Sequence, residues 1–139
     1  MMTASSATPT SPSSPAALSR TWLRMAVLYF VAAVLLGVGM GASGNHGLRT
    51  VHAHANLLGW VSMALFALVC GHWPAVAQDT LAKVQFWLYQ CALPVMLGSL
   101  AVKYTGGTGY DAPLGISAVV LALAVVLWCV MVWRGTRQD

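Results

Sequence analysis

Histidines carry most of the chemistry that this sequence offers, and two of them stand close together. His52 and His54 lie in the run VHAHANLLGW, where Asn56 follows them, while His46 and His72 lie in the segments on either side. Neutral imidazole is the commonest protein ligand of haem iron, copper and zinc. We therefore expect His54 and His52 to be metal or cofactor ligands, with Asn56 beside the same site.

The spacing of the two histidines predicts separate roles for them. Residues two apart on an α-helix point about 200° away from each other, so both imidazoles cannot reach one metal from a regular helix. We expect His54 to share its helix face with Thr50, Leu57, Leu58 and Val61. His52 would supply a second ligand or a hydrogen bond. The alternative for the pair is hydrogen bonding at a helix start without any metal.

The composition excludes a water-soluble globule. Of the 139 residues, 58% are apolar and 7% are charged, whereas soluble domains carry about 25% charged residues. The mean hydropathy is +0.73. The seven Lys and Arg residues are scattered around apolar runs and form no stripe that could follow a nucleic-acid backbone. The sequence therefore predicts a multi-pass protein of the cell (inner) membrane, surrounded by the lipid bilayer, with no nucleic-acid partner.

Apolar runs long enough to cross a bilayer as helices predict the fold. They cover about residues 22–42, 51–70, 81–102 and 113–133, and short connectors rich in Gly, Asn, Pro and Asp separate them. We expect an all-α polytopic four-helix bundle over residues 20–135. A disordered cytoplasmic tail is expected over residues 1–19, where Ser, Thr, Pro and Ala dominate, and a short tail over residues 136–139.

The basic residues predict the orientation, because Lys and Arg in short loops stay on the cytoplasmic side. Five of them fall on the side of the termini and two on the other side. Both termini are therefore expected in the cytoplasm, with His52 and His54 near the outer surface. The alternative is that Arg20 and Arg24 begin a cleaved signal peptide. Aromatic residues near the span ends predict an interfacial belt; they are Trp22, Trp73, Tyr104, Tyr110 and Trp133.

Few other side chains could complete a metal site with His54. The first, third and fourth runs contain no histidine, so a second axial ligand would come from His52, His46, or a methionine such as Met40 or Met96. Copper held at the outer face by His46, His52 and His54 is a further alternative, since nitrogen ligands suit Cu(II). The three cysteines lack CxxC spacing and are expected to pack as small apolar residues.

The run from His54 through Asn56, Leu57 and Leu58 to Trp60 resembles a known motif. It is similar to the start of the second transmembrane helix in the large subunit of heme-copper oxidases, most of all in nitric oxide reductases. The chain from about residue 22 to 133 also looks like short four-span relatives of that subunit. The resemblance implies that His54 is an axial ligand of a low-spin haem.

The chain departs from that family in ways that limit the expected activity. The family's subunit has twelve spans and further histidine ligands, including an adjacent pair for copper, whereas this sequence has four runs and no adjacent His-His pair. A complete oxygen- or NO-reducing centre in one protomer is therefore not expected. No carboxylate lies within the apolar runs, so proton pumping is not expected either.

Residues and resemblance together predict an integral membrane protein that binds haem b and serves in electron transfer or in gas or redox sensing. Arg49 would pair with a haem propionate at the outer surface. Small residues in the spans predict a homotrimer or a dimer, and a respiratory-chain protein is a further expected partner. The alternative from another class is a cofactor-free membrane protein that assembles with a respiratory complex.

Overall fold

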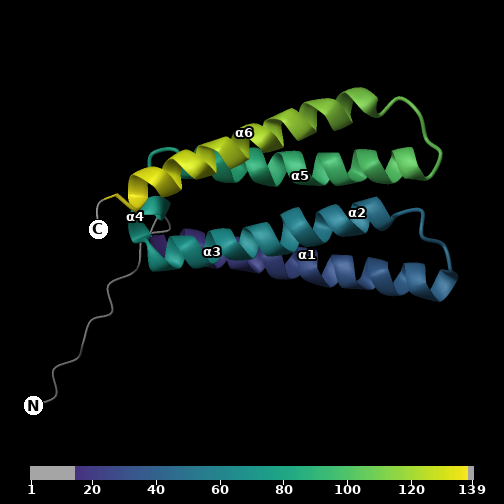
Figure 1. The fold of residues 1–139 in the computed structure, drawn as a ribbon, viewed down its shortest axis with the longest axis horizontal. Helices are drawn as coiled ribbons and strands as arrows, with labels where there is room; N and C mark the ends of the chain where they lie inside the picture. The colour runs from purple at the N-terminus through teal and green to yellow at the C-terminus, as the bar shows by residue number, and fades with distance from the viewer. Residues whose placement is uncertain (1–14, 138–139) are drawn as a thin grey trace, which may run out of the picture.

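The computed structural model describes residues 15–137, and every regular element in that range is a helix (Figure 1). In chain order the elements are α1 (Pro15–Ser43), α2 (Arg49–His54), the π-helical segment η1 (Ala55–Ser62), α3 (Met63–His72), α4 (Pro74–Ala77), α5 (Ala82–Tyr104) and α6 (Asp111–Gly135). The predicted all-α fold is confirmed.

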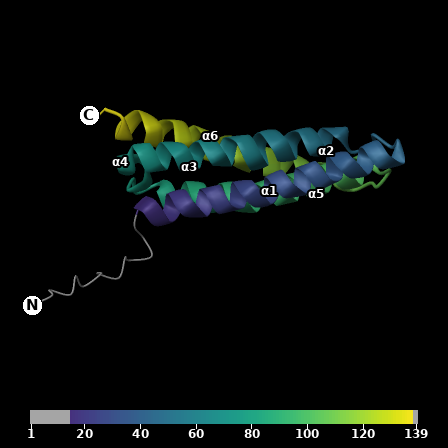
Figure 2. The same ribbon diagram turned by 90° about the horizontal axis from the view of Figure 1, so that it is seen from below.

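The chain forms two helical hairpins. The continuous helix α2–η1–α3 packs against α1, and α5 packs against α6. Figure 2, turned by 90°, shows one hairpin in front of the other. Within residues 15–137, four helices are long and apolar enough to cross a membrane, as predicted for a multi-pass membrane protein. The start of α1 and the end of α6 lie at one end of the bundle (Figure 1), here called the terminal end, and the connections 44–48 and 105–110 lie at the opposite, loop end.

The helices extend beyond the predicted spans, most of all at the start of α1. This helix begins at Pro15, so the tail predicted for residues 1–19 is wrong for its last five residues. Proline suits the first helical position, and alanine and leucine favour the turn that follows. The Ser19 hydroxyl donates to the Ala67 carbonyl at 2.9 Å, which fixes this turn on α3. The rest of the predicted tail, residues 1–14, and residues 138–139 lie outside the described residues.

Aromatic side chains join the two hairpins in the terminal half of the bundle. The Trp22 ring lies edge-on to the rings of Phe66, Phe86 and Tyr89, with centroid distances of 5.1, 4.8 and 5.6 Å. The Trp128 ring lies 4.2 Å from the Phe66 ring, centroid to centroid, so every long helix contributes a ring. Trp22 is fully buried. Its predicted place in an interfacial belt is wrong, because it fills the space between the hairpins.

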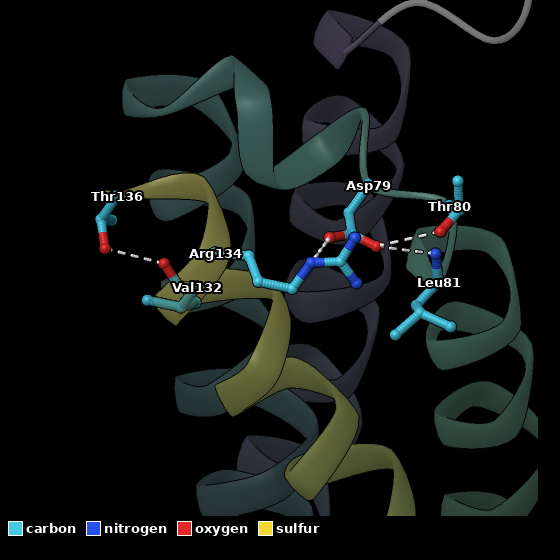
Figure 3. Close-up of polar contacts among 6 residues, drawn as sticks. All are labelled: Asp79, Thr80, Leu81, Val132, Arg134 and Thr136. Atoms are coloured by element: carbon cyan, nitrogen blue, oxygen red, sulfur yellow. Dashed lines mark hydrogen bonds and ion pairs between the residues drawn. The ribbon is translucent and has the colours of Figure 1, made fainter. Parts of the chain in front are cut away.

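The turn between α4 and α5 is tied to the end of α6 by a buried carboxylate (Figure 3). Asp79 Oδ1 accepts a hydrogen bond from the main-chain N–H of Leu81 at 2.9 Å, one residue before α5. Asp79 Oδ2 lies 3.3 Å from Arg134 Nε. A carboxylate at a helix start satisfies free N–H groups and suits the helix dipole. Asp79 therefore fixes the register of the α5–α6 hairpin at the terminal end.

A π-helical stretch in the second span was not predicted. Buried residues recur at every fourth position through this stretch and its flanks; they are Val51, Ala55, Gly59 and Met63. Side chains donate to two of its main-chain carbonyls, one from within η1 and one from α5. Ser62 Oγ donates to the Leu57 carbonyl at 2.8 Å, and the Tyr89 hydroxyl of α5 donates to the Leu58 carbonyl at 3.0 Å.

Candidate functional site around His54

His54 is the last residue of α2 and directly precedes the π-helical segment. Its Nδ1 lies 2.8 Å from the Thr50 carbonyl oxygen one turn earlier. Because a carbonyl only accepts, Nδ1 carries the proton and Nε2 of the neutral ring keeps its lone pair. Nε2 has no hydrogen-bond partner among residues 15–137. A metal-bound imidazole typically has this arrangement, with one nitrogen donating to a carbonyl and the other free for the metal.

The π-helical segment changes which residues share a face with His54. With a repeat of four, Leu58 and Ser62 follow His54 and are half-buried as it is, whereas Leu57 and Val61 fall on the exposed strip. The predicted grouping of His54 with Leu57 and Val61 is therefore wrong, since it assumed an α-helical turn. The Tyr89 hydroxyl bonds to the Leu58 carbonyl, so η1 adjoins α5 close to the half-buried face that carries His54.

His52 lies on the other flank of the same helix and contacts α1. Its Nδ1 donates to the Ala33 carbonyl at 2.9 Å. Asn56 Nδ2 donates to the His52 carbonyl at 3.0 Å and lies 3.4 Å from His52 Nε2. A Cβ added to Gly37 would lie 2.8 Å from His52 Cε1. His52 thus fills the space over Gly37 and has partners for both nitrogens, an arrangement that favours the predicted hydrogen-bonding role over ligation.

The remaining candidate residues lie apart from His54. Arg49 is exposed at the start of α2, about one and a half turns before His54. His46 is exposed in the connection after α1, with its Nδ1 3.0 Å from the Gly44 carbonyl oxygen. His72 ends α3 at the terminal end, with its ring edge-on to Trp73 at 4.3 Å.

The structure does not assemble a site made of several protein ligands. Within residues 15–137, no three side chains of His, Cys, Asp or Glu come close enough to hold one metal ion. The alternative of copper held by His46, His52 and His54 together therefore has no preformed site in one protomer. Of the two candidate methionines, Met96 is on α5, which adjoins η1, and Met40 is on α1. Both are buried.

Tyr89, Ser62 and Tyr29 lie around the site and were not singled out from the sequence. Tyr89 and Ser62 satisfy the carbonyls of the π-helical segment, and Gly59 lets Tyr29 of α1 lie against it. A Cβ added to Gly59 would lie 2.5 Å from Tyr29 Cγ. The repeat of small residues at Ala55 and Gly59 was the available signal for this close approach.

Comparisons with known proteins give no further assignment. No family model, no curated protein and no solved structure matches this chain.

Proposed function

We propose that this protein is an integral membrane protein that binds haem b, with His54 Nε2 as an axial ligand of the iron. One observation carries the proposal: Nδ1 of His54 donates to the Thr50 carbonyl, which orients the ring and leaves Nε2 free. A haem needs only one or two axial ligands from the protein. A zinc or copper ion needs three or four protein ligands, and residues 15–137 do not gather them.

The residues around His54 have defined roles in this proposal. Thr50 holds the imidazole, while His52 and Asn56 fix α2 to α1 through the Ala33 carbonyl. Arg49, which has no ion pair within residues 15–137, would pair with a propionate. A bound haem would supply one-electron transfer or gas binding. Electron transfer or gas and redox sensing is accordingly the proposed role, and a respiratory-chain protein is the proposed partner.

Metal analysis of the purified protein separates this proposal from its alternatives. Protein produced with haem supplied should contain about one iron per one or two chains, extractable as haem b, and no stoichiometric copper. Copper without iron would favour the outer-face copper site. Neither metal would favour the cofactor-free assembly partner.

The proposed orientation places the terminal end in the cytoplasm. Arg20, Arg24, Lys83, Arg134 and Arg137 belong to the terminal end, while Arg49 and Lys103 belong to the loop end. Thr108→Cys, in a background with the three native cysteines replaced by alanine, should react with a membrane-impermeant maleimide in intact cells. The cysteine-free background is the control. Labelling only after permeabilisation would reverse the orientation.

The proposed working unit is a homo-oligomer, a trimer or else a dimer. A Cβ added to Gly39, Gly41, Gly98 or Gly115 would have nothing within 4 Å, so these helix surfaces allow close approach of another chain. A neighbouring chain could also supply a second axial ligand. Native mass spectrometry from detergent should show a trimer or dimer that carries haem. A monomer with full haem occupancy would contradict this prediction.

A further inference from the structure

The terminal half of the bundle encloses polar atoms that have no partner. Gln85 of α5 and Trp22 of α1 are fully buried. Neither the nitrogen nor the oxygen of the Gln85 amide makes a hydrogen bond, and Trp22 Nε1 makes none either. A buried polar group left without a partner costs about 1–3 kcal/mol, and buried polar side chains are in general satisfied. The indole N–H, the amide N–H groups and the amide oxygen therefore call for a hydrogen-bonding partner that the protein itself does not supply.

Both residues belong to the same interface between the hairpins. The Trp22 ring contacts Phe86 and Tyr89, which lie one and four positions after Gln85 on α5. Gln85 and Tyr89 share a face of α5 and are both fully buried. The indole N–H and the amide therefore lie within the aromatic cluster that joins α1 to α5.

A groove at the terminal end runs along the same two helices. It has a volume of about 600 Å³, and its walls include Leu18 and Thr21 from α1 and Ala82 and Phe86 from α5. Gln85 lies on the helical turn between the two α5 residues, and Trp22 follows Thr21. Polar residues at the terminal end also line the groove; these are Gln78, Asp79, Thr80 and Lys83. Solvent in the groove therefore reaches Thr21 and Phe86, the residues next to Trp22 and Gln85 in the sequence.

We propose that Trp22 and Gln85 hold a buried water molecule, which enters from this groove. Water can accept from the Trp22 Nε1–H and the Gln85 amide N–H and donate to Gln85 Oε1. A buried water typically makes two to four such bonds, which is the number these atoms offer.

This water would extend a line of polar groups through the bundle interior. Tyr89 follows Gln85 by one turn of α5 and donates its hydroxyl to the Leu58 carbonyl in η1. The polar groups then run from the groove, through Gln85 and Tyr89, to the π-helical segment that begins after His54. The site depends on neither haem nor any other metal, so it can be tested independently of the proposed function.

Proton NMR of the full-length protein in detergent micelles, labelled with ¹⁵N-tryptophan, tests the proposal. Trp22→Phe identifies the Trp22 indole signal. In the wild type this N–H should give a cross-peak to water that persists with a soluble gadolinium chelate, whereas the exposed Trp133 indole near the terminal end should be broadened. Gln85→Met, close to glutamine in shape, should abolish or strongly weaken the cross-peak.

Thermal unfolding of the same samples gives a second readout. Gln85→Met should lower Tm, because the water and the indole lose a partner. Absence of a water cross-peak at Trp22 in the wild type would overturn the proposal, as would an unchanged cross-peak in Gln85→Met. A Tm of Gln85→Met above that of the wild type would also overturn it. Removing the amide raises stability only if the amide has no hydrogen-bond partner in the wild type, and therefore no bound water.

Discussion

His54→Ala is expected to abolish haem binding by the purified protein. The His54 imidazole lies on a membrane-spanning helix, with Nδ1 donating to the Thr50 carbonyl and Nε2 free, whereas His46, which makes a similar bond to the Gly44 carbonyl, is exposed in the connection after α1. Loss of a residue that merely orients a ligand lowers metal affinity by about 10–100-fold, so loss of the ligand itself should exceed about 100-fold. Titration with haem b, followed by the Soret absorbance, measures the change.

His72→Ala is the matched control, because it removes the same side chain at the opposite end of the second span. Its haem affinity should equal that of the wild type. The His54 side chain makes its hydrogen bond within its own helix, so His54→Ala should keep the elution volume and helical content of the apoprotein. Equal loss of binding in both variants would show that haem association is not site-specific.

Gly59→Ala is expected to destabilise the fold clearly, unlike alanine at span glycines whose added Cβ would meet nothing. An added Cβ would lie 2.5 Å from Tyr29 Cγ and 2.7 Å from Tyr29 Cβ. The clash is with the root of a side chain, so α1 and η1 must separate. Overpacking of this kind typically costs about 1–3 kcal/mol. Thermal unfolding in detergent should show a clearly lower Tm.

Gly98→Ala is the matched control, because it makes the same change from glycine to alanine within a spanning helix. Gly98 is in α5, and a Cβ added there would meet nothing within 4 Å. The Tm of Gly98→Ala should therefore equal that of the wild type or exceed it slightly, since alanine favours helix by about 1 kcal/mol over glycine.

Gly59→Ala should also weaken haem binding, because η1 follows His54 directly. Equal Tm values for both variants would contradict the packing described here.

Much of the fold could be predicted from the sequence because membrane spans are long and apolar. The predicted runs at 51–70 and 113–133 lie inside α2–η1–α3 and α6, which extend about two residues further at each end. The start of α1 was missed because Pro15 and the alanines after it carry too little apolar surface to mark a span. The bond from Ser19 to Ala67 that holds this turn on α3 is a tertiary contact that the sequence does not show.

The site could be predicted only in part, for a physical reason. The pattern VHAHANLLGW singled out His52 and His54, and the prediction that they have different directions agrees with their separate hydrogen bonds. The predicted set of residues on the His54 face was wrong because the spacing of residues along the sequence does not show that a π-helical segment replaces α-helix here. The contact of this segment with the Tyr89 hydroxyl of α5 is likewise a tertiary feature. Trp22 was misplaced for a similar reason, because an aromatic residue near a span end can fill an interface between hairpins as well as a membrane surface.

The absorption spectrum of the wild-type protein with haem b supplied, recorded oxidised and then reduced with dithionite, tests the central claim most directly. The proposal that His54 binds iron predicts a Soret band that saturates at a fixed ratio of haem to protein and shifts on reduction. A spectrum that never saturates, or that matches free haem in the same detergent, would contradict it.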